Sequence, residues 1–129
     1  MTAPTFLTLD EVLDLHRESI DRFGGSYEIR DMGLLESALA MPAASFGGQF
    51  LHPDLPTMAG ALLFHLVQNH PFVDGNERIG AVAARVFVMV NDGEFNPAPA
   101  DYEKLVLGVA SGKITKDEVI QFFQKEVVV

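Results

Sequence analysis

The segment LPTMAGALLFHLVQN, residues 55–69, carries the strongest structural signal in the chain because its apolar side chains recur at helical spacing. The apolar positions follow the i, i+3, i+4, i+7 pattern without a miss: Leu55, Met58, Ala59, Leu62, Leu63, Leu66 and Val67. This period gathers them on one face of an amphipathic α-helix. The sequence therefore predicts a long, well-packed helix over residues 55–69.

Helical patterns continue on both sides of this stretch. The predicted helices span residues 8–23, 31–40, 55–69, 77–91, 101–110 and 115–125. Two of them open with a capping box, in which a threonine is followed three residues later by a glutamate: Thr8 with Glu11, and Thr115 with Glu118. Residues 43–54 hold two glycines and a proline and are predicted to form a loop or short turn.

The helix predicted over residues 77–91 is apolar on nearly every side, which is typical of a helix at the centre of a fold. Its β-branched content would also suit a strand, but about fourteen residues is long for one. Six helices with short connections predict an all-α bundle. The length of 129 residues suits one domain, residues 1–129.

Composition and charge limit the possible partners and locations. The chain has no cysteine, which excludes a disulfide framework and a thiolate metal site. Its net charge of −9 leaves few basic residues to neutralise phosphates, so neither a nucleic acid nor an anionic membrane is expected as a partner. The first residues lack the basic start and apolar core of a secretory signal. We expect a cytoplasmic protein.

The loop HPFVDGNER, residues 70–78, joins the two most apolar helices and carries most of the reactive groups. His70 is the only side chain in the loop suited to proton transfer near neutral pH. Gly75 allows a tight turn into the next helix, whose first N–H groups, with Arg78, form a ready anion site. Asp74 offers the carboxylate oxygens that Mg²⁺ prefers.

Each of these residues also has a structural interpretation. A single histidine near a helix end is more often a capped or buried group than a base, and Asp74 and Asn76 would suit a turn or a helix cap. His65 lies five residues before His70, which is not the spacing of a helical metal pair. We expect His65 and His16 to be satisfied histidines of the core or of a groove.

The nine-residue loop resembles the signature of the Fic/Doc family, HPFx[D/E]GNGRxxR. It is closer still to patterns of the Doc (death-on-curing) branch such as HxFxD[AG]NKR. The segment RDMGLLESAL, residues 30–39, is also similar to that branch. The resemblance covers essentially the whole chain and implies a Fic/Doc-like helical bundle.

The resemblance also implies roles for the loop residues. His70 would be the general base, Phe72 would anchor the loop in the core, and Asp74 would bind Mg²⁺. The phosphates of ATP would be bound by Gly75, Asn76, Glu77 and Arg78. The implied function is that of a Doc-like toxin, restrained by an antitoxin. Such a toxin transfers phosphate from ATP to a Ser, Thr or Tyr hydroxyl of a target protein. Transfer of AMP (AMPylation) to the same hydroxyl is the less favoured alternative.

Two positions depart from the family pattern. Glu77 stands where the nucleotidyl transferases have glycine and Doc proteins have lysine, and it places a negative charge beside the expected phosphates. Ala81 stands where the signature has its second arginine, and Arg85 on the same helical face is a candidate to compensate in part. An alternative function follows: a catalytically impaired Fic fold that binds a nucleotide or a partner. A purely structural helical adaptor would leave the polar loop unexplained.

Overall fold

The computed structural model describes residues 3–129, so Met1 and Thr2 of the expected domain lie outside it. Within that range it contains six α-helices: α1 (Leu9–Phe23), α2 (Met32–Ala40), α3 (Leu55–Asn69), α4 (Asn76–Val90), α5 (Pro99–Ala110) and α6 (Lys116–Glu126). A 3-10 helix, η1 (Met41–Ala43), follows α2. The prediction of an all-α bundle is confirmed. No helix of residues 3–129 combines the length and the apolar character needed to cross a bilayer.

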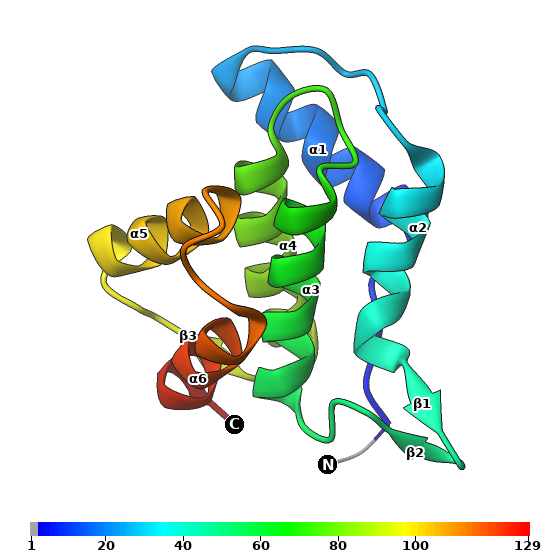
Figure 1. Cartoon of the computed structure of the whole chain (residues 1–129), viewed down its shortest axis with the longest axis vertical. Coiled ribbons are helices and arrows are strands. Elements are labelled where there is room, and N and C mark those ends of the chain that lie inside the picture. The colour runs from blue at the N-terminus through cyan, green and yellow to red at the C-terminus, as the bar shows by residue number, and fades with distance from the viewer. Residues whose placement is uncertain (1–2) are drawn as a thin grey trace.

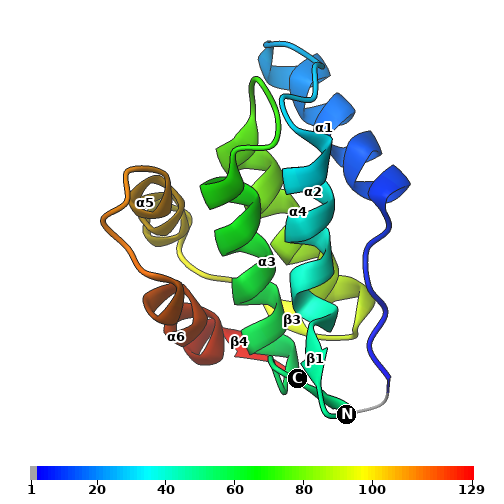
Figure 2. The same ribbon diagram turned by 45° about the vertical axis from the view of Figure 1, so that its right-hand side comes forward.

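Helix α3 lies at the centre of the bundle, with α2, α4, α5 and α6 packed around it (Figures 1 and 2). Its predicted apolar face is buried, and several of its side chains have no exposed surface at all, among them Met58, Leu63 and Leu66. Gly60 lets α6 approach closely, because a Cβ at this position would lie 3.1 Å from the Cα of Ile120. Residues 55–69 therefore form the central helix, on which α2, α4, α5 and α6 pack.

The prediction that the helix after the loop is central was wrong in part. Helix α4 packs against α1, α3 and α5, and buries Ile79, Phe87 and Val88. Its remaining side leaves Val82 and Met89 exposed. Helix α4 is therefore less enclosed than α3, although its composition is apolar nearly all round. Within residues 3–129 no other element covers the side that carries Val82 and Met89.

The predicted helix starts and ends agree closely with the structure. Both capping boxes form: the Thr8 side chain accepts the N–H of Glu11, and the Thr115 side chain accepts the N–H of Glu118. Helix α1 ends at Gly24, which has a φ of 85°. Helix α5 begins two residues before the predicted start because Pro99 occupies its first turn, where the missing N–H costs nothing.

Two short antiparallel strand pairs were not predicted. Strands β1 (Ser45–Phe46) and β2 (Gln49–Phe50) form a hairpin within the predicted loop, and β3 (Glu94–Phe95) pairs with β4 (Val127–Val128). Each strand has only two residues, too few for an alternating pattern to stand out in the sequence. The second pair ties the last residues of the chain to the segment that follows α4.

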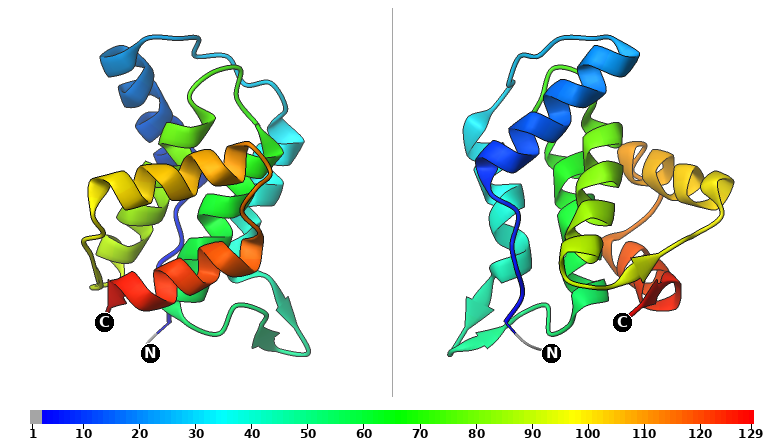
Figure 3. Two further views of the ribbon diagram at one scale, coloured as in Figure 1. Left: turned by 60° about the vertical axis from the view of Figure 1, so that its left-hand side comes forward. Right: turned by 180° about the vertical axis from the view of Figure 1, so that it is seen from behind.

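The loop between α3 and α4 lies at one end of the bundle, and the C-terminus and the first described residues lie at the other (Figure 1). Residues 24–31, which connect α1 to α2, run beside this loop (Figure 3). Helix α1 crosses α4 on the same side of the molecule (Figure 3). The predicted functional loop is therefore enclosed by two helix ends and a neighbouring connection.

A cluster of basic side chains lies partly buried between α3, α6 and the connection before α3. Burial, together with Lys116 and His52, lowers the pKa of His65 to about 4. Burial and Lys116 also lower the pKa of His52. The Nε2 atom of His65 and the Nδ1 atom of His52 are buried with no hydrogen-bond partner among the described residues. These rings are therefore held in their neutral forms.

We predict that the free energy of unfolding falls as the pH falls from about 6.5 to about 4, because in that window the unfolded state binds a proton at His65 that the folded state does not. The loss attributable to His65 should be on the order of 1–3 kcal/mol. Urea denaturation of wild type and of His65→Gln across this pH range measures it. An equally steep dependence in both proteins would contradict the prediction.

Candidate active site

His70 ends helix α3 in a left-handed backbone conformation, with φ 50° and ψ 55°. A residue other than glycine adopts such a conformation at a cost of about 1–3 kcal/mol, so neighbouring groups must hold it. Arg30 supplies two of the contacts: its Nε donates to the carbonyl of His70 at 2.6 Å, and its Nη2 donates to the carbonyl of Asn69 at 2.9 Å. These carbonyls lie at the negative end of the helix dipole, where a guanidinium is favourable.

A short antiparallel pairing joins the loop to residues 28–31. Its hydrogen bonds run from the Val73 N–H to the Glu28 carbonyl at 3.0 Å, and from the N–H groups of Arg30 and Asp31 to the Pro71 carbonyl at 2.7 and 3.0 Å. Ile29 and Phe72 form an isolated β-bridge between the two segments. The loop backbone is thus fixed on both sides of Phe72.

Phe72 is fully buried, in the position expected of a loop anchor. Its ring stacks on the ring of His16 from α1, with centroids 3.7 Å apart and planes 9° apart. The Nε2 of His16 donates to the backbone carbonyl of Asp74 at 2.8 Å. His16 is buried and satisfied, as predicted, and the structure adds that it binds the functional loop directly.

The carboxylate of Asp74 points toward the connection after α1. Its Oδ2 accepts the backbone N–H of Ser26 at 2.7 Å. Gly25, with a φ of 114°, allows this approach, because a Cβ there would lie 3.0 Å from the Cβ of Asp74. Among the described residues no hydrogen bond engages Oδ1 of Asp74, so that oxygen remains available to a cation.

Asn76 directs its side-chain amide back into the loop. Its Oδ1 accepts the N–H of Phe72 at 3.0 Å, and its Nδ2 donates to the carbonyl of Phe72 at 2.9 Å. The same Nδ2 lies 3.1 Å from Nδ1 of His70. Asn76 is only 3% exposed, so its amide is committed to the loop. Any contribution of Asn76 to an anion site would come from its backbone N–H.

The first turn of α4 presents unpaired N–H groups. Gly75 begins the helix with a φ of 81° and provides no side-chain cap. The first backbone hydrogen bond of the helix runs from the N–H of Ile79 to the carbonyl of Gly75, which leaves the N–H groups of residues 76–78 without helical partners. With the positive end of the helix dipole, this turn can bind an anion.

Arg78 lies beside this turn on the surface. Its guanidinium stacks on the exposed ring of Phe23, 4.1 Å from the centroid. It lines a hollow of about 420 Å³ between α1 and α4, and a second of about 490 Å³ between α4 and α5. Arg78 is therefore positioned beside the anion-binding turn and open to a ligand from either side.

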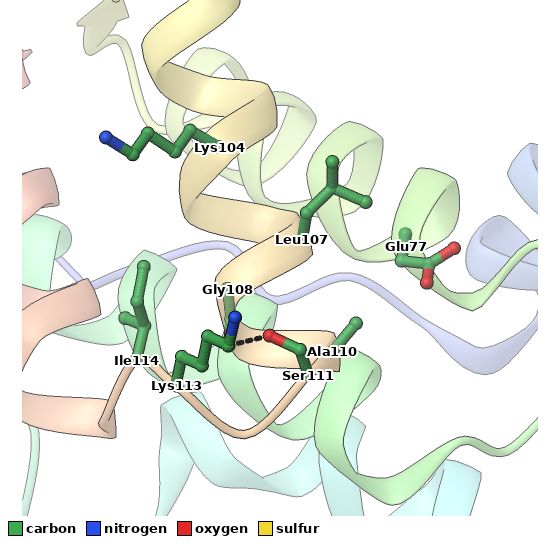
Figure 4. A pocket seen from close by; sticks show the side chains of 8 residues that line it. All are labelled: Glu77, Lys104, Leu107, Gly108, Ala110, Ser111, Lys113 and Ile114. Atoms are coloured by element: carbon green, nitrogen blue, oxygen red, sulfur yellow. Dashed lines mark hydrogen bonds between the residues drawn. The ribbon is translucent and has the colours of Figure 1, made fainter.

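Glu77 lines the hollow between α4 and α5 and also a neighbouring one of about 720 Å³ that reaches the end of α5. In Figure 4 its carboxylate lies on the opposite side of α5 from Lys104, while Lys113 lies near Ser111, at the end of α5. No salt bridge involves Glu77 among the described residues. Its carboxylate therefore lines both hollows without an ion-pair partner in the described part of the chain.

Arg85 lines the same hollow as Arg78 but is engaged elsewhere. Its Nη1 donates to the carbonyl of Phe95 at 2.8 Å, and its guanidinium lies near the rings of Phe95 and Tyr102, 5.3 and 5.5 Å from their centroids. Burial raises the pKa of Tyr102, whose hydroxyl donates to the carbonyl of Ala81. Arg85 thus shares the hollow with Arg78 while serving a structural contact.

A family model described as the Fic/DOC family matches residues 6–88, which include the loop, helices α1 to α3 and most of α4. That is more than half of the chain. The chain belongs to the Fic/DOC family. The similarity to the family signature inferred from residues 70–78 is therefore confirmed.

A curated relative of this Fic/DOC chain is described as "Toxin Doc" from Mycolicibacterium smegmatis. It is 45% identical over 69 residues, which amount to 54% of this chain and 53% of the relative. The chain thus spans about half the length of the curated relative that it matches. The relationship supports membership of the Doc branch.

Two residues of this Fic/DOC site could not be assigned from the sequence alone. Arg30 and His16 lie 40 and 58 residues from the backbone groups that they hold. In the sequence, Arg30 stands out only as part of a segment that resembles the family, and His16 only as an expected histidine of the core or of a groove. Their roles depend on how residues 24–31 and α1 pack against the loop, which no local spacing encodes.

We predict that Arg30→Ala lowers the free energy of unfolding of this Fic/DOC protein by about 1–2 kcal/mol, because two helix-end carbonyls lose a charged donor. Urea denaturation provides the measurement. Arg22→Ala is the control: Arg22 forms an exposed pair with Glu18 at 3.7 Å, so its loss should cost less than about 0.5 kcal/mol. Equal small losses in the two variants would refute the role of Arg30.

Proposed function

We propose that this chain is a Doc-type toxin enzyme that transfers the γ-phosphoryl group of ATP to a Ser, Thr or Tyr hydroxyl of a target protein in the cytoplasm. The observation that carries the proposal is the position of His70. It is fixed at the end of α3 and in contact with Asn76, the first residue of the anion-binding turn of α4. A proton acceptor and an anion site are therefore neighbours.

In the proposed reaction, the target oxygen forms a bond to the γ-phosphorus while the bond from that phosphorus to the β–γ bridging oxygen breaks. ADP leaves with the electron pair, and the hydroxyl proton passes to the imidazole of His70. General-base assistance of this kind contributes about 10²–10⁴-fold. Most of the remaining acceleration comes from positioning and from neutralising phosphate charge.

The phosphates would be bound by the free N–H groups of residues 76–78 and by the guanidinium of Arg78. Asp74 suits a magnesium ion, because Mg²⁺ is commonly bound by one or two carboxylates with phosphate oxygens and waters completing its shell. Oδ1 is the free oxygen of this carboxylate, and Ser26 holds the other. Bound there, the ion would neutralise phosphate charge.

We propose that the nucleotide extends from this turn into the hollows between α4 and α5. These hollows are lined by four of the nine basic residues of the chain: Arg78, Arg85, Lys104 and Lys113. Arg78, beside the anion site, and Arg85 in the same hollow favour a phosphate-bearing ligand there. Glu77 and Glu103 line this hollow too, and their negative charges would weaken nucleotide binding.

We further propose that an antitoxin restrains the enzyme, as the resemblance to the Doc branch implies; the relative from Mycolicibacterium smegmatis is named as a toxin. The hollow between α1 and α4 offers a place beside Arg78, with the apolar side chains of Phe23 and Val82 exposed in it. A bound segment there would cover one side of Arg78.

A second candidate function is favoured by Glu77 and Ala81, the two departures from the family pattern. A chain with a carboxylate at the phosphate site could bind a nucleotide or a partner protein without efficient transfer. AMP transfer, with attack at the α-phosphorus and release of pyrophosphate, is the less favoured enzymatic reaction. A single labelling experiment distinguishes each of these alternatives from the proposed transfer of the γ-phosphoryl group.

The test is a labelling assay in bacterial lysate with Mg²⁺ and ATP labelled at the α- or the γ-phosphate. We expect γ-label on a lysate protein, reduced at least about 10²-fold in His70→Ala. Label from the α-phosphate that depends on His70 would indicate AMP transfer instead. The absence of histidine-dependent label from either position would contradict the proposed enzyme.

Glu77→Lys belongs in the same assay. It should raise the labelling several-fold, because a like charge beside the phosphates becomes an opposite one. Glu94→Lys is the matched control, since it makes the same charge change in β3, beyond the far end of α4. Label that appears only in Glu77→Lys would identify the wild-type chain as the impaired form. Lower labelling in Glu77→Lys than in wild type would refute the inhibitory role.

A further inference from the structure

The amide of Asn76 can adopt only one orientation. If its oxygen and nitrogen were exchanged, two N–H donors would face each other at the N–H of Phe72, and two oxygens would face each other at the carbonyl of Phe72. The observed orientation pairs both backbone groups correctly, at 3.0 and 2.9 Å. Because the amide is buried, no solvent rearrangement compensates for the exchanged form.

This fixed orientation turns an N–H of Asn76 toward the ring of His70. Nδ2 of Asn76 lies 3.1 Å from Nδ1 of His70. Nδ2 is a donor only, so the contact is a hydrogen bond only if Nδ1 carries a lone pair. A neutral imidazole with its lone pair on Nδ1 carries its proton on Nε2.

We infer that Asn76 is a positioning residue that holds resting His70 in the tautomer protonated at Nε2. His70 is exposed, and its Nε2 has no hydrogen-bond partner among the described residues, so this N–H faces outward. The resting ring therefore offers a donor, suited to a phosphate oxygen, where a general base would need a lone pair.

The consequence for the reaction rests on the proposed function. For Nε2 to take the proton of a target hydroxyl, the ring proton must first leave Nε2 to water while water delivers one to Nδ1. That change replaces the hydrogen bond from Asn76 by two opposed donors. Asn76 therefore favours the donor form until its amide releases Nδ1, which makes the tautomer of His70 a control point of the site.

The test is ¹⁵N NMR of histidine side chains in the free protein at about pH 8, above the ordinary histidine pKa of about 6.5. His70→Gln assigns the His70 signals among those of the four histidines. In wild type we expect Nδ1 of His70 at the shift of an unprotonated ring nitrogen and Nε2 at that of a protonated one. A protonated Nδ1 in wild type would overturn the inference.

Two variants show whether Asn76 is the cause. Asn76→Asp replaces the donor by an acceptor of the same shape, and Nδ1 of His70 should become protonated. If that variant does not fold, Asn76→Ala should give a mixture of the two tautomers in place of a single one. Asn69→Ala is the matched control. The Asn69 side chain donates to the carbonyl of Leu34 and makes no hydrogen bond to the His70 ring among the described residues.

The role of Asn76 would be overturned if the ¹⁵N chemical shifts of the His70 ring in the Asn76 variants stayed the same as in wild type. The experiment needs no nucleotide and no target protein. A failed labelling assay with the expected tautomer would therefore reject the proposed function alone, whereas the opposite tautomer with active labelling would reject this inference alone.

Discussion

The backbone pairing between residues 28–31 and the loop after α3 is the constraint on which the rest of the site depends. It fixes the carbonyl of Pro71 and the N–H of Val73 on either side of Phe72. With Phe72 in place, Asn76 has two backbone groups to bind and can direct its N–H to His70. The site is thus ordered by protein contacts alone, which is the preorganisation that catalysis by positioning requires.

The bundle places opposite helix ends at this loop. Helix α3 brings its carbonyl end, which Arg30 neutralises, and α4 brings its N–H end, which remains open to an anion. Helix α1 packs on α4, and its His16 stacks on Phe72 and donates to the loop backbone. In a protein of net charge −9, the first turn of α4 and Arg78 form a local anion site, and Glu77 is an acidic side chain that works against it.

Much of the fold could be predicted from the sequence because its helices carry strong local signals. The period of residues 55–69 and the capping boxes at Thr8 and Thr115 predicted helix positions to within two residues. The two-residue strands gave no such signal. Within the site, residues 70–78 could be recognised because they are contiguous. Arg30 and His16 could not, because their contacts are made by tertiary packing. The sequence also could not show that the Asn76 amide turns inward.

We expect the loop to be held rigid before any ligand binds, and native-state amide hydrogen exchange followed by NMR measures this rigidity. The N–H groups of Arg30 and Val73 donate to backbone carbonyls within the pairing, and that of Phe72 donates to the Asn76 side chain. These three amides should therefore exchange far more slowly than those of Gly47 and Gly48 in the exposed β1–β2 turn. Exchange of all three as fast as that of these glycines would show that the pairing does not hold the loop.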